Sequence, residues 1–245
     1  MMNAKPKLLV SIWTVDEILE ALSSDADIID VKDPSTGSLG LAKLDMVYNT
    51  LNVVKGLKEV SVAIGDVKEY SNALDYIVYT LCLFKVNYIK IGIEMDSYDK
   101  AFSAVSSIIK TIELCSNRVN IVLVGYADWR DVNSLEPLKI VELAKATNAH
   151  GVMIDTRVKS GKTVFDNIQL NYLKEFVSVA HKNSLFTAIA GGLRIEHIPT
   201  CVKLGFDVIG VRTAACNGNR LGKISKDAIR LLKTEIENAI KLENA

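Results

Sequence analysis

Apolar residues along the chain follow one repeated pattern, in which a short run rich in Val, Ile and Leu precedes a turn and a segment with helical spacing. The runs predict eight buried strands, at Leu8–Trp13, Ile28–Val31, Val60–Ile64, Tyr88–Ile91, Asn120–Val124, Gly151–Ile154, Phe186–Ala190 and Val208–Val211. Helical spacing predicts helices over Val15–Leu22, Asp45–Leu57, Tyr70–Phe84, Asp99–Cys115, Leu138–Ala146, Leu170–His181, Ile198–Leu204 and Ser225–Leu242. Strands that alternate with helices indicate a parallel sheet.

Eight such units in 245 residues predict an α/β fold of the (β/α)8 class, a TIM barrel, which typically takes about 250 residues. No linker rich in Pro, Gly or Ser divides the chain, so residues 1–245 are expected to form a single catalytic domain. The alternative is an open doubly wound sheet. Such a sheet usually has a glycine-rich turn after its first strand, and Ser11-Ile12-Trp13-Thr14 contains no glycine.

Composition excludes several classes of protein. Lys+Arg and Asp+Glu are equal at 29 each, so the basic excess expected of a nucleic-acid-binding protein is missing. The chain has neither an apolar run of the roughly 20 residues needed for a membrane helix nor the apolar core of a signal peptide, which predicts a cytoplasmic protein. Its scattered cysteines, Cys82, Cys115, Cys201 and Cys216, are therefore expected to be reduced. The oligomeric state stays open, and a homo-oligomer is compatible with the sequence.

Charged residues interrupt three of the apolar strands. Asp30 and Lys32 lie on the strand face opposite their apolar neighbours, and Lys90 and Asp155 do the same in the fourth and sixth strands. Helices cover the outer face of a barrel, so these charges are predicted to point inward at the C-terminal ends of the strands, where barrel enzymes hold their active sites. Lys159 follows in the loop after Asp155.

Lysines crowded into an apolar interior favour the neutral amine, because burial and mutual repulsion both disfavour the ammonium form. A neutral amine attacks a carbonyl to form a Schiff base, and a neighbouring carboxylate can pair with the remaining ammonium groups or transfer protons. Two lysines and two aspartates on three strands therefore favour carbonyl chemistry. The structural alternative is a network of ion pairs that fills the barrel.

The last two strands end in residues suited to binding an anion. Gly191 and Gly192 follow the seventh strand, and Arg212 and Thr213 follow the eighth. Loops after these strands form the recurrent phosphate site of the barrel fold, although the glycines alone also fit a tight turn. The segment Ser160–Thr163 resembles the end of a phosphate-binding loop but lacks the first glycine of that motif. The sequence has no cluster of histidines and cysteines that would predict a zinc site, whereas Mg²⁺ bound by carboxylates alone stays open.

Short segments spread over almost the whole chain form one ordered set. They are Leu9-Val10-Ser11, Ala26–Lys32, Gly37-Ser38-Leu39-Gly40, Gly65-Asp66-Val67, Tyr88-Ile89-Lys90, Gly125–Asp128, Asp155-Thr156, Lys159–Asp166 and Gly210-Val211-Arg212. In these segments the chain resembles the (5-formylfuran-3-yl)methyl phosphate synthase family of methanofuran biosynthesis.

The resemblance implies a barrel lyase that condenses two molecules of glyceraldehyde 3-phosphate, with loss of one phosphate and water, to the furan phosphate. It implies a Schiff base on Lys32, proton transfer by Lys90, and essential roles for Asp30, Asp155 and Lys159. It implies no metal and no organic cofactor, and a small phosphosugar as the partner. The segment Ala190–Arg194 departs from the family pattern, in which a serine is expected near the second glycine.

Two other functions remain open at the level of sequence. One is a class I aldolase or dehydratase that uses the same Lys32 chemistry on another phosphosugar. The other is a non-catalytic phosphosugar-binding or scaffold protein in which the charges only fill the barrel.

Overall fold

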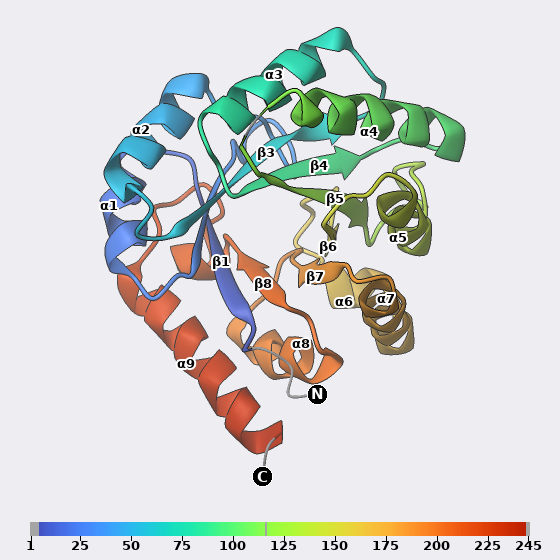
Figure 1. Ribbon diagram of the computed structural model, residues 1–245. Helices are drawn as coiled ribbons and strands as arrows, with labels where there is room; N and C mark the ends of the chain where they lie inside the picture. The colour runs from blue at the N-terminus through green and yellow to red at the C-terminus, as the bar shows by residue number, and fades with distance from the viewer. Residues whose placement is uncertain (1–4, 116, 244–245) are drawn as a thin grey trace.

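The computed structural model describes residues 5–115 and 117–243, which form a closed barrel of parallel strands in sequence order (Figure 1). The strands are β1 (Lys7–Ile12), β2 (Ile28–Val31), β3 (Glu59–Val67), β4 (Tyr88–Ile93), β5 (Asn120–Tyr126), β6 (Gly151–Asp155), β7 (Phe186–Ile189) and β8 (Val208–Val211). The last strand pairs with the first, with Lys7 opposite Val208. The predicted barrel is therefore confirmed, and the open-sheet alternative is wrong.

Helices surround the barrel, and α9 runs along the outside near β1 and β8 (Figure 1). They are α1 (Asp16–Ser23), α2 (Leu44–Val54), α3 (Asn72–Leu83), α4 (Tyr98–Glu113), α5 (Pro137–Ala146), α6 (Val164–Asn167), α7 (Leu170–Lys182), α8 (Ile198–Leu204) and α9 (Lys226–Glu243). The 3-10 turns η1 (Ile195–His197) and η2 (Ala214–Cys216) precede α8 and α9. The short helix α6 was not predicted, because four residues are too few to show helical spacing. Among the described residues, no helix is long and apolar enough to span a membrane.

Apolar side chains pack in two layers, one between strands and helices and one inside the barrel. Ile29 and Val31 of β2 belong to the outer layer and are fully buried. The inner layer is smaller and includes Leu9, Ile28 and Met153. Because side chains alternate along each strand, this packing turns the intervening polar residues of β2, β4 and β6 toward the barrel axis.

Strand β3 extends beyond its predicted end. The sequence predicts a strand that stops at Ile64, whereas β3 continues to Val67 with a register shift against β4 between Ala63 and Asp66. A bulge of this kind redirects the side chains that follow it. It places Asp66 at the C-terminal end of the barrel, next to the loop after β2.

One expectation about the cysteines is wrong. Cys82 of α3 and Cys115, just after α4, are joined in a disulfide, with their Cα atoms 6.5 Å apart. The two residues are 33 positions apart in the sequence, and only the packing of α3 beside α4 brings them together. Cys201 and Cys216 are free and buried, as expected.

Candidate active site

The charged residues predicted from the strands do point into the barrel. Asp30, Lys90 and Asp155 are at most 2 % exposed, and Lys32 is 6 % exposed. They come from β2, β4 and β6 and from the residue after β2, so alternate strands supply them. Tertiary structure therefore gathers groups that lie up to 125 positions apart, since the first and last are residues 30 and 155.

Asp30 and Lys90 form a buried ion pair. Lys90 Nζ lies 2.8 Å from Asp30 Oδ2, and Ser11 Oγ donates to the same oxygen at 2.8 Å. Within the described residues, Asp30 Oδ1 and the hydroxyl of Ser61 on β3 have no hydrogen-bond partner. Asp30 and Ser61 are register partners on neighbouring strands. Buried polar atoms normally have partners, so these two atoms can bond to a buried water.

Lys32 differs from the other lysines because it has no carboxylate partner. Its Nζ donates to the carbonyl oxygen of Ser38 at 3.1 Å, and no described carboxylate oxygen lies within 4.0 Å of it. Burial lowers the pKa of Lys32 to about 7, aided by the charges of Lys90 and Lys159 and opposed by those of two aspartates. Near neutral pH this amine is therefore substantially uncharged and nucleophilic.

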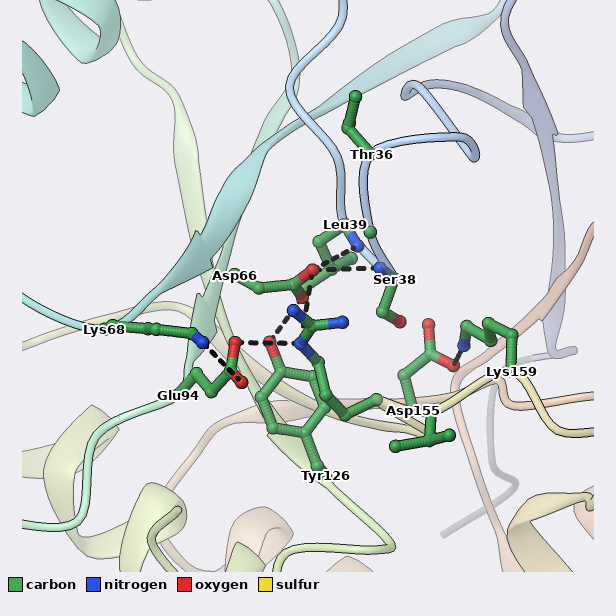
Figure 2. Close-up of polar contacts among 12 residues, drawn as sticks. Thr36, Ser38, Leu39, Asp66, Lys68, Glu94, Tyr126, Asp155 and Lys159 are labelled. Carbon is green, nitrogen blue, oxygen red and sulfur yellow. Dashed lines mark hydrogen bonds and ion pairs between the residues drawn. The ribbon is translucent and has the colours of Figure 1, made fainter. Parts of the chain in front are cut away.

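Asp155 forms the second ion pair, with Lys159 (Figure 2). Lys159 Nζ lies 2.8 Å from Asp155 Oδ1 and also donates to Thr156 Oγ1 at 3.1 Å. Burial alone would raise the pKa of Asp155, but the charges of Lys159 and Lys32 outweigh it and lower the pKa to about 2. Asp155 is therefore a carboxylate at every pH at which the enzyme is expected to work.

A cavity of about 640 Å³ opens above these residues. Its lining includes every residue predicted for the site except Asp30, which lies beneath Lys90 in the ion pair. Seven lysine and arginine side chains but only two carboxylates line it, and they are Lys32, Lys90, Lys159, Lys162, Arg194, Arg212, Arg220, Asp155 and Glu196. Such a lining suits a substrate with several negative charges.

The glycine pair after β7 lies in the cavity wall with left-handed backbone. Gly191 and Gly192 have φ values of 103° and 64°, which L side chains rarely adopt. A Cβ atom at Gly191 would also lie 2.9 Å from the amide nitrogen of Thr156. The turn therefore requires glycine whether or not it binds phosphate, which leaves both interpretations open. Thr213, from the loop after β8, lines the same cavity.

Arg212 reaches the cavity, but most of its guanidinium is already engaged. It forms a buried ion pair with Glu17 of α1 at 2.9 Å and donates to the carbonyl oxygens of Ser11, Arg220 and Gly222. A guanidinium has five N–H donors, and these contacts use four of them. At most one N–H is left for a ligand, so a phosphate contact by Arg212 stays a prediction.

A second polar cluster was not assigned from the strand pattern. Asp66 on β3 accepts the amide of Ser38 at 2.9 Å and the hydroxyl of Tyr126 at 2.6 Å (Figure 2). Arg157 lies 3.5 Å from Asp66 and 2.8 Å from Glu94. Burial, and then the charge of Asp66, raises the pKa of Tyr126, so its hydroxyl stays protonated and donates.

This cluster fixes the loop that covers Lys32. A Cβ atom at Gly37 would lie 2.3 Å from Asp66 Oδ2, so the close approach of the carboxylate requires glycine there. On the other side, the hydroxyl of Ser38 donates to the carbonyl oxygen of Thr156 at 2.9 Å, and Leu39 is fully buried in the inner core. The segments Gly37–Gly40 and Gly65–Val67 marked this region in the sequence, but nothing local to either showed that they meet.

The chain is similar to known proteins along most of its length. Residues 8–233 match the model of the family described as 4-HFC-P synthase. A (5-formylfuran-3-yl)methyl phosphate synthase from Methanococcus maripaludis is 37% identical over 226 residues, which cover 91% of this chain and 96% of that protein. The enzyme of the same name from Methanosarcina barkeri is 32% identical and covers 94% and 99%.

Solved structures show the same architecture. The 3-hexulose-6-phosphate synthase from Salmonella typhimurium superimposes with a TM-score of 0.66 at 17% identity, over 95% of this chain and 99% of that one. At this level of identity the likeness concerns the fold alone.

Proposed function

Because the chain belongs to the 4-HFC-P synthase family, we propose that it is a (5-formylfuran-3-yl)methyl phosphate synthase that works through a Schiff base on Lys32. It condenses two molecules of glyceraldehyde 3-phosphate, with loss of one phosphate and water. The observation that carries the proposal is the state of Lys32, a buried amine with no carboxylate partner and a pKa lowered to about 7 at the floor of a cationic cavity.

The first step uses that amine. After isomerisation of one triose phosphate to its ketone form, Lys32 Nζ attacks the carbonyl carbon, water leaves, and an imine forms. The second triose phosphate loses the proton next to its aldehyde and then its phosphate, which gives an enol. The terminal carbon of this enol attacks the imine carbon on Lys32, which forms the branched carbon skeleton of the furan phosphate. The buried pair of Asp30 and Lys90 supports these proton transfers, because Lys90 lies close enough to lower the pKa of Lys32.

Departure of phosphate is followed by release of Lys32 and closure of the furan ring. The amine of Lys32 leaves by elimination, a substrate hydroxyl adds to the new ketone, and loss of water completes the ring, so that one phosphate and two waters are lost overall. Asp155 and Lys159 are paired at the cavity wall, where the carboxylate can accept a proton and the ammonium can stabilise departing phosphate. Gly191, Gly192 and Thr213 are proposed to contact a substrate phosphate through the loops after β7 and β8, with Arg212 supporting those loops. The reaction is proposed to need neither a metal ion nor an organic cofactor.

Two measurements on one preparation test this function. Incubation with pure glyceraldehyde 3-phosphate should yield a six-carbon furan phosphate by mass spectrometry, together with free phosphate. Borohydride added during turnover should reduce the imine and attach the triose phosphate to the peptide containing Lys32. Lys32→Arg is the matched control, since arginine keeps a positive charge but stays protonated and cannot form the imine.

The outcomes separate the alternatives. Trapping on Lys32 without a furan product would point to another class I aldolase or dehydratase. Neither trapping nor product would favour a binding protein with a structural charge cluster. Product formation by Lys32→Arg at more than a small fraction of the native rate would overturn the Schiff-base role.

A further inference from the structure

Arg220 is a cation of the cavity wall that the proposed function has not used. It lies in the loop between η2 and α9, is partly buried, and lines the same cavity as Lys32 and Asp155. One of its terminal nitrogens donates to the carbonyl oxygen of Gly37 at 2.8 Å. In the described part of the chain no carboxylate oxygen lies within 4.0 Å of its guanidinium. Its other N–H donors are therefore available to an anion.

The position of Arg220 relative to Lys32 is defined by two consecutive peptide groups. Arg220 donates to the carbonyl oxygen of Gly37, and Lys32 donates to that of Ser38. The loop after β2 thus contacts both the guanidinium and the proposed imine nitrogen, and both line the same cavity. A small phosphorylated substrate bound to Lys32 can place its phosphate within reach of this guanidinium.

Arg212 holds the backbone that carries Arg220, and these contacts leave Arg212 little capacity to bind an anion itself. Its Nε donates to the carbonyl oxygen of Arg220 at 2.9 Å, and another nitrogen donates to that of Gly222 at 2.5 Å. Arg212 is itself anchored by Glu17, which also accepts the amide of Ile224 at 3.1 Å. The buried pair of Arg212 and Glu17 therefore fixes the short segment from Arg220 to Ile224.

Burial lowers the pKa of Arg220, and the charges of Asp155 and Asp66 oppose this shift. A cation in such surroundings is incompletely compensated, and a phosphate dianion would supply the missing charge. Guanidinium groups bind phosphate in a two-point fork, which gives geometric selectivity as well as attraction.

We propose that Arg220 binds the phosphate of the triose phosphate attached to Lys32, and that Arg212 is the positioning residue that holds it there. The proposal rests on the proposed function and names a phosphate-binding residue for it. Arg220 then provides selection for phosphorylated over unphosphorylated aldehydes at the step of imine formation.

The test compares two substrates in the full chain. Borohydride trapping is measured with glyceraldehyde 3-phosphate and with unphosphorylated glyceraldehyde, and the ratio of the two rates is the readout. Arg220→Gln should lower that ratio at least tenfold and weaken the binding of inorganic phosphate, followed by the shift in melting temperature with phosphate concentration. Arg194→Gln is the matched control, because Arg194 lines the same cavity but is exposed and lies 3.5 Å from Glu196. It should change the ratio less than threefold.

An unchanged ratio in Arg220→Gln would overturn the assignment, as would an equal fall in Arg194→Gln, which would reduce the effect to general electrostatics. If Arg220→Gln does not fold, as judged by circular dichroism, Arg220→Lys replaces it. A smaller fall of about threefold is expected there, because lysine keeps the charge but loses the fork, and an unchanged ratio again counts against the proposal. Phosphate binding needs no turnover, so a chain that makes no furan but loses phosphate affinity with Arg220→Gln would refute the proposed function and leave Arg220 a phosphate ligand.

Discussion

At the scale of single residues, the three lysines of the site differ in their partners. Lys90 is paired with Asp30 and Lys159 with Asp155, whereas Lys32 Nζ, among the residues that the structure describes, hydrogen-bonds only to the backbone carbonyl of Ser38. The same residue type at three positions thus serves as two paired ammonium groups and one amine of lowered pKa. The ion pairs nearby give Lys32 its environment, since Lys90 and Lys159 add repulsion to the effect of burial.

The pH dependence of imine formation follows from this environment. The pKa of Lys32 is lowered to about 7, so the fraction of neutral amine rises as the pH increases through 7 and falls below it. Initial rates of borohydride trapping with glyceraldehyde 3-phosphate, measured between pH 5 and 9, should therefore increase with a midpoint near 7. Rates that show no midpoint and still rise steeply at pH 9, as expected for an amine with the ordinary lysine pKa of about 10, would contradict attack by an amine of lowered pKa.

Asp155→Asn separates a catalytic role from a structural one. Asparagine keeps the shape but removes the charge, and Lys159 is 23% exposed, so water can solvate the ammonium that loses its partner. We expect little change in melting temperature and a loss of turnover of about a hundredfold or more, the scale of one acid–base group. The midpoint of imine formation should move below 7, because Asp155 raises the pKa of Lys32.

A purely structural role for Asp155 would give the opposite result. A large fall in melting temperature with near-normal turnover per folded molecule would assign Asp155 to structure alone. Thermal melts, product assays and the trapping profile should be collected on the same preparation of the variant.

At the scale of elements, loops from different strands are tied together over the site. The loop after β2 is held by Asp66 of β3 on one side and by Thr156, after β6, and Arg220, after β8, on the other. The barrel supplies the positions of the strand ends, and these contacts give the loops one arrangement above them. The carbonyl that binds Lys32 belongs to such a loop, so loop order and amine position are linked.

Asp66→Asn tests that link. The amides of Ser38 and Leu39 lose a charged acceptor at 2.9 and 3.4 Å, so hydrogen exchange at these two amides should become faster. Turnover should fall by about tenfold or more, because small displacements of a reacting group are costly. Tyr126→Phe removes one neutral donor to the same carboxylate and should have the smaller effect on both measurements. Faster exchange without any loss of turnover would separate the loop from catalysis.

Arg212→Met tests the anchor below the loop after β8. Methionine has a similar length but leaves the carboxylate of Glu17, which is 1 % exposed, buried without its partner. Removal of one partner of a buried pair typically costs about 3–5 kcal/mol, so the free energy of unfolding should fall by that order. Denaturant titration measures it, and Arg194→Met is the control at a solvent-exposed pair. Equal small losses in both variants would show that Arg212 is not an anchor.

At the scale of the whole molecule, a chain with no net charge concentrates positive charge at one place. Lys+Arg and Asp+Glu balance at 29 each, yet seven lysine and arginine side chains and two carboxylates line the cavity. The net charge of the whole chain therefore does not indicate how the cavity binds phosphorylated substrates. The local excess attracts them, and two of its members, Lys90 and Lys159, add to burial, which is the main cause of the lowered pKa of Lys32.

Salt should weaken this attraction selectively. Raising the NaCl concentration from about 0.05 to 0.5 M shortens the screening length from over 10 Å to a few ångström. We expect kcat/KM for glyceraldehyde 3-phosphate to fall severalfold, mainly through KM, while trapping of unphosphorylated glyceraldehyde changes little. An equal salt effect on both substrates would show that the cavity charge does not act on the phosphate.

The sequence by itself determined the barrel and the inward charges. Both depend on local periodicity, since alternation within β2 places Asp30 and Lys32 on the face opposite the apolar outer layer. The order of strands and helices then leaves few ways to close a sheet. For the same reason the predicted strands lie close to the observed ones, apart from β3, where a bulge continues the strand beyond Ile64.

Only the tertiary structure decided which charges pair. Lys90 is 60 positions from Asp30 and Arg212 is 195 positions from Glu17, and no local pattern distinguishes those partners from other carboxylates. These pairings leave Lys32 without a carboxylate, engage Arg212, and turn the unpaired Arg220 toward the cavity. The disulfide between Cys82 and Cys115 has the same origin, the packing of two neighbouring helices. Long-range contacts depend on how elements pack in three dimensions, and the spacing of residues along one strand or helix does not contain that information.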